Sequence, residues 1–224
     1  MTTPLGINGF GRARTLIGLG LAVGGLATAY RVFLRERCLT WGATGDEASM
    51  TMPGDDLLAE PAVLATRAIT VHAPATAVWP WLVQMGSGRG GAYTYDWIEN
   101  LLGLDMHSAR EVLPEFQNLK VGETYPLGPK GPRLRVEILD PDHALVFRSE
   151  DGNWVWAFAL LHCAEGIRLI SRNRIAMPHA SIPARLFNLL VMEPGSLIME
   201  RRMLLGIKER AEALARNPIS IAPA

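Results

Sequence analysis

The stretch 196–217, SLIMERRMLLGIKERAEALARN, decides the fold of this chain. Its apolar residues recur at intervals of three or four positions and form one stripe of a helix: Met199, Met203, Ile207, Ala211 and Leu214. Charged residues such as Glu200 and Arg201 lie largely off this stripe. Ser196 is a favourable N-cap, and Pro218 ends the helix. A long helix with one apolar stripe must bury that stripe, so we expect it to pack on a sheet.

The sequence upstream of this helix predicts that sheet. Alternating apolar residues, which mark half-buried strands, occupy four segments: 134–139, 144–149, 154–163 and 167–177. Short turns such as Asp151-Gly152-Asn153 connect them. With an earlier strand at 66–72, they predict an antiparallel meander rather than a parallel sheet, because strands and helices do not alternate.

Two short helices are predicted between the first strand and the meander. The first contains Pro80, which has to kink or split it. A glycine-rich loop at 86–91 leads to the second helix, where Asp96 and Glu99 have the spacing of a capping box. Behind the meander, an apolar segment at 183–192 is predicted to end at Pro194-Gly195. The predicted fold class is therefore α+β, a helix-grip fold in which a curved antiparallel sheet holds the long C-terminal helix.

This order of elements resembles the SRPBCC superfamily of START-like, polyketide cyclase/dehydrase proteins over about residues 41–215. The stretches that carry the resemblance are VWPWLVQMGSGRGGAYTYDWIENLLGLDMHSA (78–109) and EPGSLIMERRMLLGIKERAE (193–212). They look like an actinobacterial-type subgroup that often has an N-terminal hydrophobic segment. The resemblance implies a helix-grip fold around a cavity for hydrophobic ligands. It implies no single chemistry and supplies no catalytic residues.

The chain is predicted to have four parts. They are an N-terminal membrane segment with its flanks (1–37), a connector packing on the domain (38–64), the helix-grip domain (65–217) and a flexible tail (218–224).

The N-terminal segment is predicted to anchor the chain in a membrane. Residues 15–30 carry no charge, and residues 15–34 are long enough as a helix to cross a hydrocarbon core of about 30 Å. A cleaved signal peptide ending near Ala27-Thr28-Ala29 and a helix packed on protein remain alternatives. Arginines that follow the segment favour a single pass through the cell membrane, with the soluble domain in the cytoplasm. The spacing of Gly20 and Gly24 indicates weak self-association.

Composition excludes several classes of protein and site. The chain has 22 Lys+Arg and 22 Asp+Glu, so it lacks the basic excess of a nucleic-acid-binding protein. Two cysteines, Cys38 and Cys163, cannot form a disulfide framework or a four-cysteine zinc site, and no metal is predicted. The stretch GINGFGR (6–12) resembles a dinucleotide-binding turn, but no strand precedes it. No cofactor is therefore predicted.

The candidate ligand-binding residues are those expected to face the interior of the grip. On one strand, Trp154, Trp156 and Phe158 share a face, and on the next strand Ser171 and Asn173 are expected to point inward. The opposite face of that second strand carries three arginines and is predicted to meet solvent. The complete set of predicted ligand-binding residues is Trp81, Met85, Tyr93, Trp97, Trp154, Trp156, Phe158, Ser171, Asn173 and Met203.

A catalytic role is the weaker expectation. His107 is a candidate general base because carboxylates lie nearby in the sequence, and Tyr93 is a second candidate. The predicted function is a membrane-anchored START-like domain that binds a hydrophobic small molecule or lipid and is not catalytic. The alternatives are a polyketide cyclase/dehydratase-like enzyme acting in the same cavity, and a structural protein with a filled interior.

Overall fold

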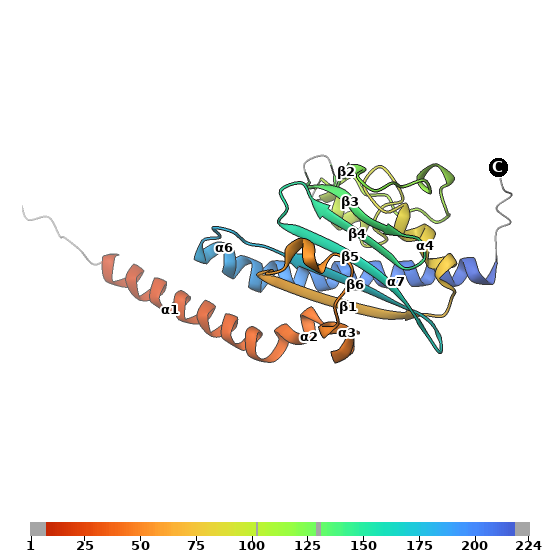
Figure 1. Ribbon diagram of the computed structural model, residues 1–224. Helices are drawn as coiled ribbons and strands as arrows, with labels where there is room; N and C mark the ends of the chain where they lie inside the picture. The colour runs from red at the N-terminus through yellow and green to blue at the C-terminus, as the bar shows by residue number, and fades with distance from the viewer. Residues whose placement is uncertain (1–7, 102, 129–130, 218–224) are drawn as a thin grey trace, which may run out of the picture.

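A six-stranded antiparallel sheet, with strand order β1-β6-β5-β4-β3-β2, forms the centre of the molecule (Figure 1). The computed structural model describes residues 8–101, 103–128 and 131–217. The strands are β1 (Val63–Val71), β2 (Thr124–Pro126), β3 (Arg133–Asp140), β4 (Ala144–Ser149), β5 (Trp154–Cys163) and β6 (Gly166–Ile175). The long helix α7 (Glu193–Arg216) crosses one face of this sheet, here called the inner face. The predicted α+β helix-grip fold is confirmed.

The remaining helices are short, except at the N-terminus. They are α1 (Asn8–Ala29), a π-helical segment (Tyr30–Leu34), α2 (Arg35–Leu39), α3 (Gly45–Ser49), α4 (Ala75–Val83), α5 (Asp96–Leu101) and α6 (Ile182–Phe187). Short 3-10 turns occur at Asp55–Leu58 and Pro114–Phe116, and a second π-helical segment spans Asn188–Met192. Helices α4 and α5 are the two predicted between the first strand and the meander.

The C-terminal helical segment does not break at Pro194-Gly195, and that prediction is wrong. Helix α6, the π-helical segment and α7 follow one another with helical backbone throughout. The N–H of Glu193 donates to the carbonyl of Asn188, five residues back, so the hydrogen-bond pattern shifts just before the proline. Pro194 then occupies the first turn of α7, where its missing N–H costs little.

The main core lies between the inner face and helices α7 and α4. Trp156, Phe158 and Leu160 of β5 pack there with Met203 and Ile207 of α7. The opposite residues of β5, such as Val155 and Ala157, belong to a second cluster on the outer face. Period-two alternation along β5 therefore separates two cores.

The outer face is covered by the segment that connects α2 with β1. Its Met52 packs on Val155 and Ala157 of the sheet. Two arginines of β6 reach into the same segment and are buried, Arg172 at 2% and Arg174 at 8% exposure. The prediction that this face of β6 meets solvent is therefore wrong.

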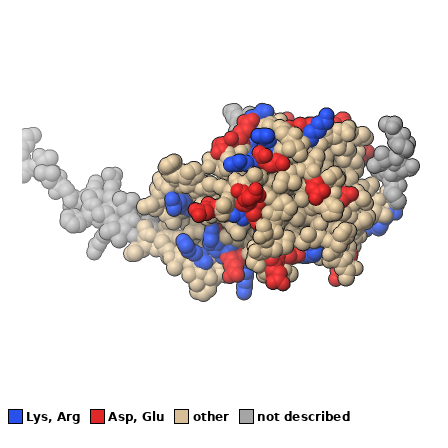
Figure 2. Space-filling view, in the orientation of Figure 1, with Lys and Arg blue, Asp and Glu red and all other residues tan. Residues whose placement is uncertain are grey.

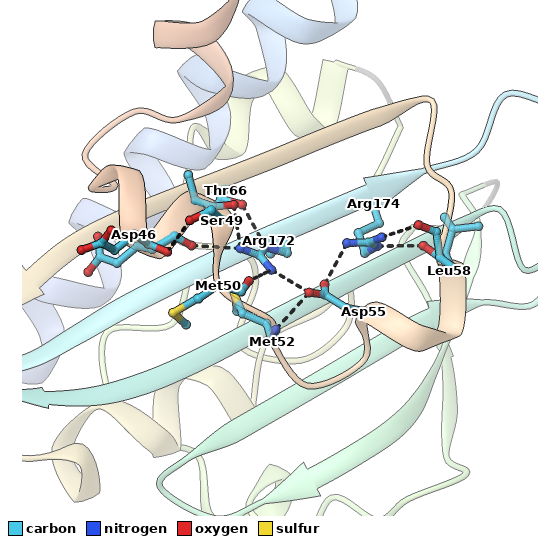
Figure 3. A network of polar contacts seen from close by, with 12 residues as sticks. Asp46, Ser49, Met50, Met52, Asp55, Leu58, Thr66, Arg172 and Arg174 are labelled. Carbon is cyan, nitrogen blue, oxygen red and sulfur yellow. Dashed lines mark hydrogen bonds and ion pairs between the residues drawn. The ribbon is translucent and has the colours of Figure 1, made fainter.

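Asp55 explains how these arginines are buried (Figure 3). Its Oδ2 accepts from Arg172 Nη1 at 2.7 Å, and its Oδ1 accepts from Arg174 Nη1 at 3.0 Å. Backbone carbonyls of Met50 and Leu58 accept further bonds from the two guanidinium groups. A buried arginine is stable when its donors are matched in this way, and the alternation of β6 alone could not show which segment would supply the acceptors.

Helix α1 extends away from the sheet at the end of the molecule where α6 lies (Figure 1). Large apolar side chains are exposed on α1, at Leu21 and Leu26, and on the π-helical segment after it, at Phe33. None of the helices in the described residues is both long and apolar enough to cross a membrane. The predicted transmembrane helix over 15–34 is therefore not supported. The predicted tail 218–224 lies outside the described residues.

Candidate functional site

A cavity of about 170 Å³ lies between α7, the inner face of β5 and β6, and the chain around α5. Most of its wall is apolar. Three methionines contribute, one from the loop after α5 and two from α7: Met106, Met199 and Met203. Leu104, Leu127 and Ala92 complete the apolar part. The polar lining is Thr94, Glu99, Asn173, Ser196 and Glu200. A small apolar cavity with a few polar groups is the usual form of a ligand site.

The sheet side of the cavity is an aromatic wall with fixed orientation. The indole rings of Trp154 and Trp156 are stacked, with centroids 5.6 Å apart and an interplanar angle of 19°. Trp154 Nε1 donates to Asn173 Oδ1 at 2.8 Å, and Trp156 Nε1 donates to Ser171 Oγ at 3.0 Å. Because both indole N–H groups already have acceptors, the wall offers a ligand its aromatic surface rather than hydrogen bonds.

Glu200 of α7 joins this wall to a buried arginine of β1. Its carboxylate pairs with the guanidinium of Arg67, and its Oε1 accepts from Ser171 Oγ and, at 3.0 Å, from Asn173 Nδ2. The same guanidinium group donates from Nη2 to Ser196 Oγ at 3.0 Å and from Nε to the carbonyl of Cys38 at 3.1 Å. The network connects α2, α7, β1 and β6, so it holds the helix on the sheet.

The pKa of Glu200 is governed by two opposing influences. Burial is the larger and raises the pKa of this carboxyl. Arg67, Ser171 and Asn173 act in the other direction, because each favours the carboxylate. Glu200 is thus a buried acid with matched partners, which is how proteins tolerate charge in their interior.

Glu99 of α5 is the second acid of the cavity, and its situation is different. It is 5% exposed, yet neither its Oε2 nor the hydroxyl of Thr94 beside it has a hydrogen-bond partner among the described residues. Burial raises the pKa of Glu99 and the charge of Asp96 raises it further, while the Thr94 hydroxyl lowers it by its proximity to the carboxylate, although the two groups do not meet in hydrogen-bonding geometry. A buried polar atom without a partner is costly, by about 1–3 kcal/mol, so a ligand that supplied the partner would bind favourably.

Four of the predicted ligand-binding residues line this cavity: Trp154, Trp156, Asn173 and Met203. Others are buried nearby without lining it, namely Trp81, Met85, Tyr93, Phe158 and Ser171. Trp81 lines a separate surface groove beside Arg210. Trp97 is on the outside of α5, with 69% of its surface exposed.

The two catalytic candidates are not brought together at the cavity. His107 lies on the surface, where its Nε2 is 3.3 Å from Asp105 Oδ1, and neither residue lines the cavity. The hydroxyl of Tyr93 donates to the carbonyl of Trp81 at 2.9 Å, and burial raises its pKa well above the ordinary value. A tyrosine held in this way is a structural donor rather than an acid or base at neutral pH. In the described residues, no group of three or more His, Cys, Asp and Glu side chains is arranged to hold a metal ion.

Sequence reasoning missed the acids and the arginine of the site. Glu99 has the spacing of a capping box with Asp96, but the Asp96 carboxylate instead accepts from the backbone and hydroxyl of Ser108. Glu200 was grouped with the polar side of its helix. One signal was available, since Arg67 shares a strand face with Ile69 and that face is otherwise apolar. An arginine on a buried face needs an acid partner.

Comparisons with known proteins reach the fold only. No family model and no curated protein matches the chain. Among solved structures, it is similar to a protein from Mesorhizobium loti (15% identity, TM-score 0.41, 70% of this chain and 100% of that chain). It is also similar to the KanY protein (14%, 0.45, 67% and 97%) and to a Polyketide_cyc-like protein from Corynebacterium glutamicum (18%, 0.33, 68% and 89%). The fold is established by the strand order and α7, and similarity at this level says nothing about the ligand.

Proposed function

We propose that this domain binds a small, largely apolar molecule in the cavity between α7 and the sheet. The observation that carries the proposal is an apolar cavity whose wall contains a buried acid, Glu99, without a partner. A filled structural core would normally leave neither the space nor the unmatched polar atom.

The size of the cavity favours a small molecule over a whole lipid. A cavity of about 150 Å³ accommodates benzene, whereas drug-sized ligands occupy about 300–1,000 Å³. At about 170 Å³, the cavity suits a molecule slightly larger than a single aromatic ring. Trp154 and Trp156 provide a flat surface on which such a ring can stack.

Binding without chemical change is the function that the geometry supports best. Both carboxylate oxygens of Glu200 already accept hydrogen bonds from Arg67, Ser171 and Asn173, so this acid is held by the fold rather than presented to a substrate. The alternative is a cyclase- or dehydratase-like enzyme, and it is favoured by Glu99, a buried carboxyl with a raised pKa as general acids have. Turnover of a bound molecule, lost in Glu99→Gln, would support that alternative.

The binding proposal can be tested by NMR of the full chain with ¹³C-labelled methionine methyl groups, titrated with toluene. The chain has 9 methionines, and Met106, Met199 and Met203 line the cavity. We expect shifts at these three, while Met52 on the outer face does not move. Met199→Trp should abolish the shifts by filling the cavity, and Ile198→Trp, at an exposed neighbouring position, should not. Absence of any shift at saturating toluene would overturn the proposal.

We also propose that the domain rests on a membrane surface through the end that carries α1 and α6. Exposed apolar side chains gather on the π-helical segment that follows α1, at Val32 and Phe33, and on α6, at Ile182 and Phe187. Basic side chains lie beside them, because Arg31, Arg35 and Arg185 line a groove to which α6 and the start of α2 both contribute. Figure 2 shows Lys and Arg side chains near this end of the visible face. Apolar side chains flanked by arginines are typical of helices that lie in the interface of an anionic membrane.

Flotation with vesicles tests the membrane proposal. Vesicles containing phosphatidylglycerol should bind the full chain, and pure phosphatidylcholine vesicles should bind it less. Replacing Phe33 and Phe187 by aspartate should weaken binding by about tenfold for each residue, since each change removes an aromatic side chain that enters the membrane interface on binding. Leu161→Asp, at an exposed position near the end of β5, is the control for an added surface charge. Equal binding by all variants would overturn this proposal.

A further inference from the structure

The polar groups of the cavity differ in what they still offer a ligand. Most donors in the lining are already in use. Both indole N–H groups are bound, Asn173 Nδ2 donates to Glu200, and Ser196 Oγ donates to the carbonyl of Glu193 at 2.8 Å. Thr94 is the one lining residue in the described part of the chain whose hydroxyl lacks a partner. A ligand with a carboxylate or phosphate would therefore lose its hydration and gain almost no donors.

The group that remains free is an acceptor. Glu99 Oε2 is buried without a hydrogen bond, and no Lys or Arg in the described residues forms an ion pair with Glu99. Arg67, which bonds to two residues of the cavity lining, is engaged by Glu200 and Ser196. The charge that acts on Glu99 comes from another acid, Asp96. This part of the cavity therefore lacks positive charge.

We propose that the cavity selects a small aromatic amine, with its ring against Trp154 and Trp156 and its ammonium group on Glu99 and Thr94. This inference rests on the proposed binding function and specifies the ligand class for the same site. An ammonium supplies both things that Glu99 lacks, a hydrogen-bond donor and a positive charge. A charge-assisted hydrogen bond is about twice as strong as one between neutral groups. The indole faces also attract a cation more strongly than other aromatic side chains do.

A matched set of probes separates this inference from the proposed function. 2-Phenylethylamine, 2-phenylethanol and phenylacetate have the same ring and differ in the polar group. Each is titrated into the full chain, with calorimetry for affinity and the methionine methyl signals of Met106, Met199 and Met203 for location. We expect the amine to bind about tenfold or more tightly than the alcohol, and phenylacetate to bind least.

Variants identify the carboxyl responsible. Glu99→Gln should lower the affinity for the amine to that for the alcohol and leave alcohol binding nearly unchanged. Thr94→Val should lower it less. Glu115→Gln is the matched control, because it makes the same charge change at an exposed position on Pro114–Phe116. If Glu99→Gln does not fold, the order of affinity of the three probes for the unaltered chain still tests whether the cavity prefers an amine.

The outcomes are distinguishable. Equal affinity for amine and alcohol, or preference for phenylacetate, would overturn the amine inference and leave the binding function standing. Absence of cavity shifts with all three probes and with toluene would overturn the binding function itself. Amine binding that persists in Glu99→Gln but is lost in Glu115→Gln would place the amine elsewhere on the surface and also overturn the inference.

Discussion

The two faces of the sheet both bury arginine, but they use it differently. On the outer face, Arg172 and Arg174 meet Asp55 and several backbone carbonyls of the connecting segment (Figure 3). On the inner face, Arg67 meets Glu200 of α7. The outer network fixes the segment between α2 and β1 on the sheet. The inner network ties down a helix and, through Asn173 and Ser171, two tryptophans of the cavity wall.

The comparison shows that burial alone does not identify a functional polar group. The arginines on both faces and their acids have matched partners, and matched groups are explained by the fold. Glu99 is buried to a similar extent on the inner side, but its Oε2 has no hydrogen-bond partner that would explain its burial. The unmatched acid, rather than the larger charged networks, is therefore the feature that points to a ligand.

The largest expected effect is at Glu200. Glu200→Ala should lower the free energy of unfolding by about 3–5 kcal/mol, because it leaves the Arg67 charge buried without its partner. The measurement is urea denaturation. The double variant Arg67→Met/Glu200→Leu should cost much less than either single change. A loss below about 1 kcal/mol in Glu200→Ala would show that Arg67 has another acceptor in solution.

A smaller effect is expected on the outer face, at Asp55. Asp55→Ala should cost about 1.5–3 kcal/mol, since Arg172 and Arg174 keep their carbonyl acceptors and lose only the carboxylate. Hydrogen exchange should rise in residues 45–59 and stay unchanged in α5. Asp56→Ala, the exposed neighbour, is the control. An exchange increase that spread equally to α5 would contradict the view that the two faces are separate.

The smallest effect, and the one of opposite sign, is expected at Glu99. Burial raises the pKa of this carboxyl above its ordinary value of 4.5, so the folded chain binds the proton more tightly than the unfolded chain. The stability that protonated Glu99 contributes is present below the ordinary value and is lost as the pH rises through the folded-state pKa. Glu99→Gln removes this loss and should therefore be more stable than the unaltered chain at about pH 8, by about 1 kcal/mol.

Thermal unfolding at several pH values checks the prediction for Glu99. The gain in Glu99→Gln should shrink as the pH falls below the ordinary value of 4.5, where Glu99 becomes neutral in both states. Glu115→Gln should show no such dependence. A Glu99→Gln variant less stable than the unaltered chain at every pH would indicate that the Glu99 carboxylate has a protein partner.

Most strand and helix positions could be predicted because local patterns determine them. The predicted strands 144–149 and 154–163 coincide with β4 and β5, where apolar alternation is clearest. Strand β2 was missed, since its three residues lie in a segment rich in Pro and Gly. The helix break at Pro194 was predicted wrongly, because a π-helical segment before the proline shifts the hydrogen bonds.

The site could be predicted only in its apolar half. The alternation of residues along β5 and the apolar stripe of α7 show which side chains face the interior. They therefore predict Trp154, Trp156 and Met203. Glu99, Thr94 and Glu200 do not, because an acid on a short helix or beside an apolar stripe has the same sequence pattern whether solvent or protein surrounds it. The exposure of His107 and Trp97 depends on the same tertiary detail.

By itself, the sequence determined the helix-grip order of elements, because the periods of strand and helix and the turn residues are local properties. Only the tertiary structure decided which polar side chains meet. Arg67 and Glu200 are 133 residues apart along the chain, and the same packing that brings them together leaves Glu99 alone. Partnering of buried charge is a property of long-range contacts, which no local pattern records.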